Sequence, residues 1–160
     1  MTEPFIIRPA TEADVLLLLQ FIRDLAEYEK LAHECIADEA ALRAAMFGAR
    51  PCAEALLGFV GEEPVAFAIF FQNFSTFLAR PGIYLEDLFV RPAFRRRGYG
   101  RAMLEHLARE ANRRGCGRFE WAVLDWNQPA IDAYQRFGAT VMPDWRVCRL
   151  SGEALTRHGT

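Results

Sequence analysis

The sequence has no long hydrophobic run and no secretory signal. Its longest apolar runs, such as Ala66 to Phe71, are far shorter than the ~20 residues that span a bilayer. The N-terminus lacks the basic segment, apolar stretch and small-residue cleavage site of an exported protein. We therefore expect a cytoplasmic protein that does not bind membranes.

Paired cysteines are also missing. The four cysteines (Cys35, Cys52, Cys116 and Cys148) are scattered, form no CxxC pair, and have no histidine at metal-ligand spacing. This pattern argues against a zinc site and a disulfide framework, so we expect no metal. Lysine is nearly absent, because Lys30 is the only lysine among 19 basic residues. The net charge of −2 gives no general attraction to nucleic acid.

What is present is the composition of one ordinary globular domain. The chain has 160 residues, of which 52% are hydrophobic and 25% are charged. There is no internal repeat, low-complexity segment or linker, so we expect a single domain over residues 1–160.

Hydrophobic periodicity predicts an α/β fold. The expected strands cover residues 5–8, 55–60, 65–71, 83–90 and 119–124, with one or two more within 141–150. The expected helices cover residues 12–29, 38–47, 98–114 and 127–137, and residues 73–82 are expected to form a polar loop. An antiparallel first half would thus meet a strand–helix–strand unit in one mixed sheet.

The turn RRRGYG, residues 95–100, stands before the helix predicted at Gly98. A helix start presents unpaired N–H groups and the positive end of the helix dipole. Glycines let the backbone approach a ligand closely, and arginines add charge-assisted contacts to phosphate oxygens. The turn is therefore suited to a pyrophosphate. The alternative is a tight turn with solvated arginines.

Two familiar phosphate motifs are excluded. The third glycine of a GxGxxG fingerprint would fall at Met103, and no GxxxxGK[ST] sequence occurs.

The turn resembles the acetyl-coenzyme A signature RxxGxG of the GNAT superfamily of N-acetyltransferases. The resemblance extends over nearly the whole chain, through IIRPATEAD (6–14), LAEYEK (25–30), YLEDLFV (84–90) and WNQPAIDAYQRFGA (126–139). This combination is similar to the spermidine/spermine and thialysine N-acetyltransferase branch. It implies a GNAT-like mixed sheet with helices on both faces, an acetyl-coenzyme A cosubstrate, a small primary amine as acceptor, and a homodimer.

The resemblance also implies a role for individual residues. The backbone of Leu88, Phe89 and Val90 would bind the pantetheine arm as an added strand does. The pyrophosphate would be held by the turn and helix start, namely Arg95, Arg96, Arg97, Gly98, Tyr99, Gly100 and Arg101. Asn127 would contact the pantetheine region, and Tyr134 would protonate the leaving thiolate. Tyr28 and Glu29 would line the amine pocket together with Glu86.

Glu86 also stands out without the family, because it lies in an apolar strand. Strict alternation places it on the face that carries Tyr84, Leu88 and Val90, with Asp87 on the opposite face. A buried carboxylate needs a partner, which could be an arginine in a structural ion pair. The functional interpretation is a base, acting through water, or an anchor for a cationic substrate.

The substrate amine is mostly protonated at neutral pH, which explains why a base is needed. With a pKa near ~10.4, only about one part in ~10³ is free amine at neutral pH, and only free amine attacks a thioester.

The acceptor is left open between a polyamine and an amino-acid-like amine. Asp144 is the only acid shortly before Trp145, and the loop at 73–82 offers Ser75 and Thr76 in place of an acid. A long polycation would want several spaced carboxylates. A protein or peptide N-acetyltransferase, and a coenzyme A-binding regulatory domain without turnover, are the alternatives. A nucleic-acid module is the least favoured.

Overall fold

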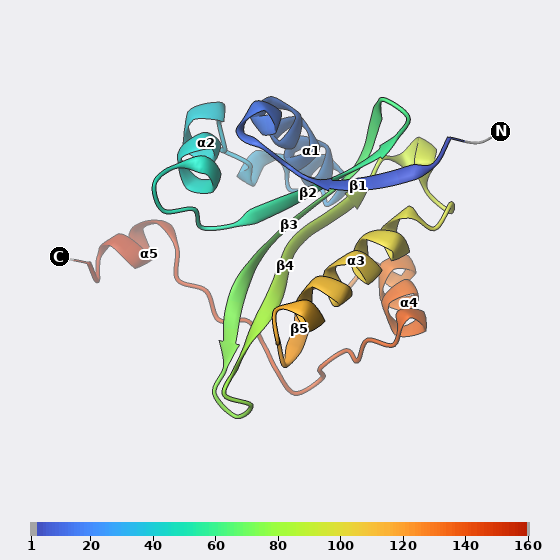
Figure 1. Ribbon diagram of the computed structural model, residues 1–160. Coiled ribbons are helices and arrows are strands. Elements are labelled where there is room, and N and C mark those ends of the chain that lie inside the picture. The colour runs from blue at the N-terminus through green and yellow to red at the C-terminus, as the bar shows by residue number, and fades with distance from the viewer. Residues whose placement is uncertain (1–2, 160) are drawn as a thin grey trace. The chain divides into compact units, whose positions relative to one another are not determined.

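Five strands form one mixed sheet in the computed structural model, which describes residues 3–159. The spatial order follows the chain order, and all neighbours are antiparallel except the last pair, which is parallel. The strands are β1 (Phe5–Pro9), β2 (Glu54–Val60), β3 (Glu63–Ser75), β4 (Arg80–Val90) and β5 (Arg118–Trp121). A helix between β4 and β5 provides the crossover that parallel strands require (Figure 1). The expected mixed α/β fold is confirmed.

Four helices are close to the predicted ranges, whereas the short helix at Gly152–Thr156 was not predicted, and side-chain caps explain two of the helix starts. The helices are α1 (Val15–Tyr28), α2 (Glu39–Phe47), α3 (Tyr99–Arg113), α4 (Gln128–Phe137) and α5 (Gly152–Thr156), with short 3₁₀ turns at Glu12–Asp14, Ala32–Glu34 and Pro92–Phe94. Asp38 accepts a hydrogen bond from the Ala41 N–H at 2.8 Å, which satisfies one open donor of α2. None of the described helices has the length and apolar character needed to cross a membrane.

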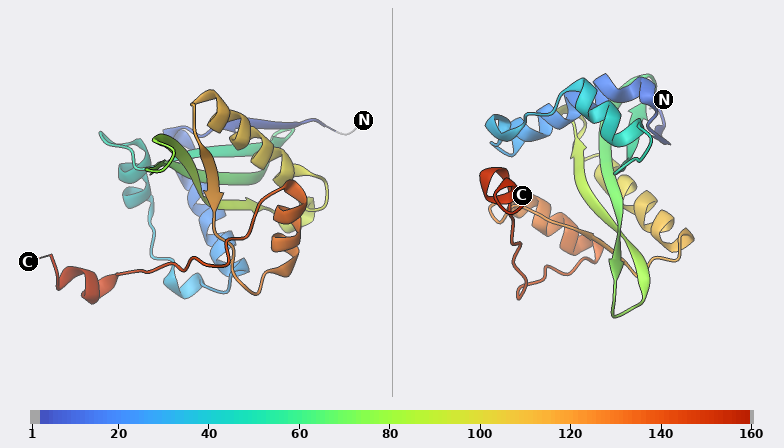
Figure 2. Two further views of the ribbon diagram at one scale, coloured as in Figure 1. Left: turned by 90° about the horizontal axis from the view of Figure 1, so that it is seen from below. Right: turned by 90° about the vertical axis from the view of Figure 1, so that its left-hand side faces the viewer.

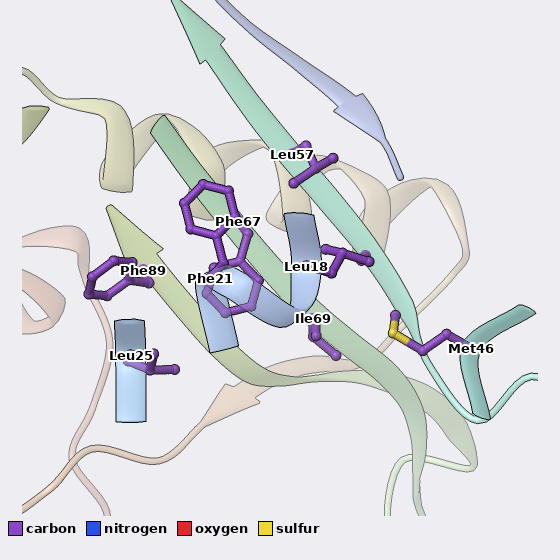
Figure 3. Packing of buried hydrophobic residues seen from close by; sticks show 9 residues of the cluster. Leu18, Phe21, Leu25, Met46, Leu57, Phe67, Ile69 and Phe89 are labelled. Carbon is purple, nitrogen blue, oxygen red and sulfur yellow. The ribbon is translucent and has the colours of Figure 1, made fainter. Parts of the chain in front are cut away.

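Helices cover both faces of the sheet, with α1 and α2 on one face and α3 on the other (Figures 1 and 2). On the α1 face, Leu18, Phe21 and Leu25 pack against β2, β3 and β4 (Figure 3). The rings of Phe21 and Phe67 stack with centroids 5.1 Å apart. On the α3 face the helix buries Met103 and Leu107.

Two of the sequence predictions about elements are wrong. Within the loop expected at residues 73–82, only residues 76–79 form a turn. β3 continues to Ser75 and β4 begins at Arg80, so that a long hairpin extends beyond the other strands (Figure 1). Pairing with the opposite strand outweighs the polar sequence there. Residues 141–150 form no strand, and their apolar side chains, among them Trp145 and Val147, are exposed.

The chain divides into two compact units, with the boundary after Ala122. The first holds the sheet, α1, α2 and α3, and the second holds α4 and α5. The expectation of a single domain over the whole chain stays a prediction.

An ion pair stabilises the start of α1, and its stabilising effect should depend on pH. Asp14 accepts hydrogen bonds from the Arg8 guanidinium at 2.8 and 2.9 Å and from the Thr11 N–H at 2.8 Å. The Arg8 hydrogen bond lowers the pKa of Asp14 to about 2. Because the folded pKa is depressed, this stabilisation is present above the unfolded pKa of ~3.9 and is lost as the pH falls toward 2.

We therefore expect Asp14→Asn to destabilise the protein at neutral pH and to reduce the loss of stability between pH 4 and 2. The expected difference is on the order of 1 kcal/mol, because Arg8 is 43% exposed and solvent screens the pair. Urea denaturation at pH 7, 4, 3 and 2 measures it, with Asp24→Asn on α1 as the control. Equal acid sensitivity of the wild type and Asp14→Asn would contradict the assignment.

Candidate functional site

Glu86 is an extra residue in β4. Across the ladder to β3, Leu85 pairs with Phe70 and Asp87 pairs with Ile69, so Glu86 stands opposite no residue of its own. Such a β-bulge bends the strand and shifts the two-residue alternation by one position. The residues after Glu86 therefore point to the opposite face from the one that unbroken alternation would give them.

The bulge corrects the predicted face of the site. Tyr84, Asp87 and Phe89 pair with residues 71, 69 and 67 of β3, which share the face covered by α1. Leu88 and Val90 pair with residues 68 and 66 and lie on the opposite face. The prediction that Tyr84 shares a face with Leu88 and Val90 is wrong, because the alternation is broken at Glu86.

The Glu86 side chain itself is exposed, whereas Asp87 is half-buried. Among residues 3–159, no arginine forms an ion pair with either carboxylate. The structural ion pair considered from the sequence is therefore not formed within this part of the chain.

The two central strands separate after Leu85. β5 pairs with β4 only over residues 82–85 of β4, and β5 ends at Trp121. From Glu86 to Val90, β4 is bordered by β3 alone among the described strands. This edge includes the backbone of Leu88, Phe89 and Val90, and an extended amide-containing molecule could add to it as a strand does.

The turn before α3 has a strained backbone and an open surface. Arg96 has φ = 62° and Gly98 has φ = 81°, both left-handed. Among residues 3–159, no side chain caps the first turn of α3, and a Cβ built on Gly98 would have no neighbour within 4 Å. The positive end of the helix dipole thus faces open space, which suits an anion.

The arginines expected at this turn point in different directions. Arg95 lies over the ring of Tyr28, at 4.5 Å from its centroid, and its Nε donates to the Val90 carbonyl at 2.9 Å. Arg96 and Arg97 are exposed, and Arg101 forms an ion pair with Glu105 at 2.8 Å.

Tyr99 differs in kind from its neighbours, because its ring stacks on Phe5 of β1 with centroids 4.3 Å apart. Only its backbone therefore faces the turn. Arg96, Arg97 and the glycine backbone remain the groups best placed for an anion, whereas Arg95 contacts the end of α1.

The end of α1 brings a third acidic side chain close to β4. The Tyr28 ring lies 6.2 Å from that of Phe89, and Glu29 is the next residue. Burial raises the pKa of Glu29. Burial also raises the pKa of Asp87, to about 7, and the negative charges of Glu86 and Glu29 add to the effect. Glu29 and Glu86 both act electrostatically on Asp87, and we call these three residues the acidic group.

The structure buries Asp87 more than Glu86, which the sequence analysis did not foresee. The signal was present as two adjacent carboxylates inside an apolar strand, but alternation assigned only one of them to the site. Within residues 3–159, no three or more His, Cys, Asp or Glu side chains are arranged to hold a metal ion.

Asn127 and Tyr134 belong to the second unit. Asn127 is buried and caps α4, with its Oδ1 accepting from the Ala130 N–H at 3.4 Å. Pro129 lies in the first turn of α4, and Gly138 ends the helix with φ = 107°. Tyr134 is half-buried on the same helix. Their roles toward cofactor and leaving group stay predictions.

Comparison with known proteins gives consistent matches. A model of the acetyltransferase (GNAT) family matches residues 19–139. The chain is 38% identical to a thialysine N-epsilon-acetyltransferase of Sus scrofa, over 94% of both chains. It is 31% identical to an L-ornithine N5-acetyltransferase of Arabidopsis thaliana, over 93% of this chain and 85% of that protein.

Solved structures share the fold at lower identity. An integron cassette protein from the mobile metagenome of V. cholerae has a TM-score of 0.82 at 22% identity, covering 97% of each chain. An aminoglycoside acetyltransferase in complex with sisomicin has a TM-score of 0.78 at 15% identity, covering 93% of this chain and 97% of that one. At these identities the likeness concerns the fold alone.

The backbone of the turn before α3 predicts different effects on stability when its two glycines are replaced by alanine. Gly98→Ala forces a Cβ into a left-handed conformation, which we expect to cost about 1–2 kcal/mol of stability. Gly100→Ala is the matched control, because its Cβ meets only Val90 Cγ2, at an ordinary 3.7 Å. Within a helix, that change should be neutral or stabilise by up to ~1 kcal/mol. Urea denaturation of both variants measures the difference, and equal destabilisation would count against this turn geometry.

Proposed function

Because the chain belongs to the GNAT family of acetyltransferases and is an N-acetyltransferase, we propose that it transfers acetyl from acetyl-coenzyme A directly to a primary amine of a small molecule. One observation carries the choice of acceptor. Glu29, Glu86 and Asp87 lie together beside the open edge of β4, and within residues 3–159 no arginine is paired with them. An acidic group of this kind suits a cationic substrate.

The residues around the turn fit the proposed donor. The β4 edge at Leu88, Phe89 and Val90 offers backbone groups to the pantetheine amides. The exposed Arg96 and Arg97, with the glycine backbone, offer charge and open N–H groups to the diphosphate. When bound, acetyl-coenzyme A supplies the thioester carbonyl that the amine attacks.

The acidic group has two tasks toward the acceptor. It holds the ammonium group near the end of β4, and it accepts the proton that must leave before the nitrogen can attack. Glu86 is exposed and anchors the ammonium, directly or through water. Tyr28, whose ring contacts Arg95 and lies near Phe89, forms one wall of the proposed amine pocket.

For the leaving thiolate we propose Tyr134 as the general acid, as the family resemblance implies. A phenol with a pKa near ~10 gives a proton slightly uphill to a thiolate whose conjugate acid is near ~8.5. The contribution to the rate is therefore modest. A homodimer is likewise proposed from the resemblance alone.

A panel of amines tests the proposed function. With saturating acetyl-coenzyme A and detection of free thiol, we expect thialysine and ornithine to have kcat/KM values at least about tenfold above those of spermine and of N-terminal peptides. A tenfold ratio corresponds to ~1.4 kcal/mol. The reason is that a single acidic group suits one ammonium better than a long polycation. The highest value with an N-terminal peptide would favour a protein acetyltransferase instead, and no thiol release with any amine would refute the proposal.

Replacing the tyrosine tests the proposed general acid. We expect Tyr134→Phe to lower kcat by about 10- to 100-fold, at the low end of what acid–base catalysis contributes. Affinity for acetyl-coenzyme A, measured by calorimetry, should stay within about twofold, because the phenyl ring remains. An unchanged kcat would remove Tyr134 from the mechanism.

A further inference from the structure

We propose that Asp87, rather than Glu86, is the carboxylate that takes the proton from the bound ammonium group. This inference rests on the proposed function and names the base within that site. It follows from the bulge at Glu86, which places Asp87 on the face of β4 that carries Phe89 and is covered by α1.

The position of Asp87 differs from that of Glu86 in its exposure to water. Asp87 lies across from Ile69 and two residues before Phe89, and both of these are buried in the core against α1. Its side chain is half-buried, whereas Glu86 is exposed. A carboxylate among apolar side chains is poorly solvated and gains more from receiving a proton.

The charged groups around Asp87 favour the same role. Glu86 adjoins it on β4, and Glu29 faces it from the end of α1, so both nearby charges are negative. Arg95 comes from the turn, but it is held over the rings of Tyr28 and Phe89 and donates to the Val90 carbonyl. As a result, burial and like charge raise the pKa of Asp87 to about 7.

The proton transfer is simple to write. An N–H bond of the ammonium breaks and an O–H bond forms on Asp87. The freed nitrogen lone pair then forms a C–N bond to the thioester carbonyl carbon. As the carbonyl re-forms, the C–S bond breaks, the thiolate takes a proton from Tyr134, and the second proton lost by the nitrogen restores the phenol. Taking isolated groups, transfer from an ammonium of pKa ~10.4 to a carboxyl of ordinary pKa ~3.9 is unfavourable by about 10⁶- to 10⁷-fold. With the pKa of Asp87 at about 7, the same transfer is unfavourable by only about 10³- to 10⁴-fold. Burial thus makes Asp87 a stronger base than a fully solvated carboxylate.

The test is the pH dependence of kcat/KM for the best amine, measured between pH 5.5 and 9 with saturating acetyl-coenzyme A. For the wild type we expect kcat/KM to rise tenfold per pH unit below about pH 7, where Asp87 is protonated, and to level off above it. Asp87→Asn should lose about 100-fold or more of kcat/KM and the inflection near 7. Glu86→Gln should lose less than about tenfold and keep the inflection, and Asp87→Glu should recover part of the activity.

The opposite pattern would overturn the inference. If Glu86→Gln abolishes the inflection while Asp87→Asn keeps it, Glu86 is the base and the proposed function stands. If the wild type acetylates no amine, the proposed function fails and this inference fails with it. A ¹³C NMR titration measures the pKa of the Asp87 carboxyl directly in the wild-type protein, so this test does not depend on the folding of any variant. A midpoint near 7 would support Asp87 as the base, and one near 4 would refute it.

Discussion

The pairing of β3 with β4 is the constraint on which the site depends. It is the longest ladder of the sheet, and it contains an irregularity between Ile69 and Phe70 where Glu86 is the extra residue. Because this ladder is anchored by buried residues on both faces, the extra residue cannot be absorbed by sliding the strand, and the alternation must change at that point. The same ladder continues where β5 ends, so one strand offers an open backbone edge and two carboxylates within five residues.

Much of the fold could be predicted from the sequence, because its determinants are local. Helical spacing of apolar residues gave α1 to α4 to within a few residues but not the short α5. Asp38 and Asn127 cap the starts of α2 and α4, and Gly138 ends α4 in a left-handed conformation. Residues 73–75 and 80–82 were assigned wrongly to a loop, because their strands depend on pairing with each other. Residues 141–150 show the reverse case, since they have the apolar content of a strand but no strand partner among the described residues.

The same distinction between local features and features that depend on distant residues applies to the candidate site. The turn before α3 was predictable, because glycines and arginines before a helix determine its backbone and charge locally. The exchange of faces at Glu86 was not predictable, because a bulge exists only in relation to the opposite strand. The direction of Arg95 was also missed, since it depends on two rings, Tyr28 and Phe89, that come from distant parts of the chain.

Arg95 forms no ion pair with a carboxylate among residues 3–159. An arginine near a poorly solvated carboxylate would normally pair with it, and the pKa of that carboxylate would then fall. Here the guanidinium is engaged by the Tyr28 and Phe89 rings and by the Val90 carbonyl. A cation over aromatic rings gains about 0.5–1 kcal/mol and keeps its charge. Arg95 is thus directed to two aromatic rings and a backbone carbonyl rather than to a carboxylate, which leaves Asp87 available for a proton and the acidic group available for a cationic amine.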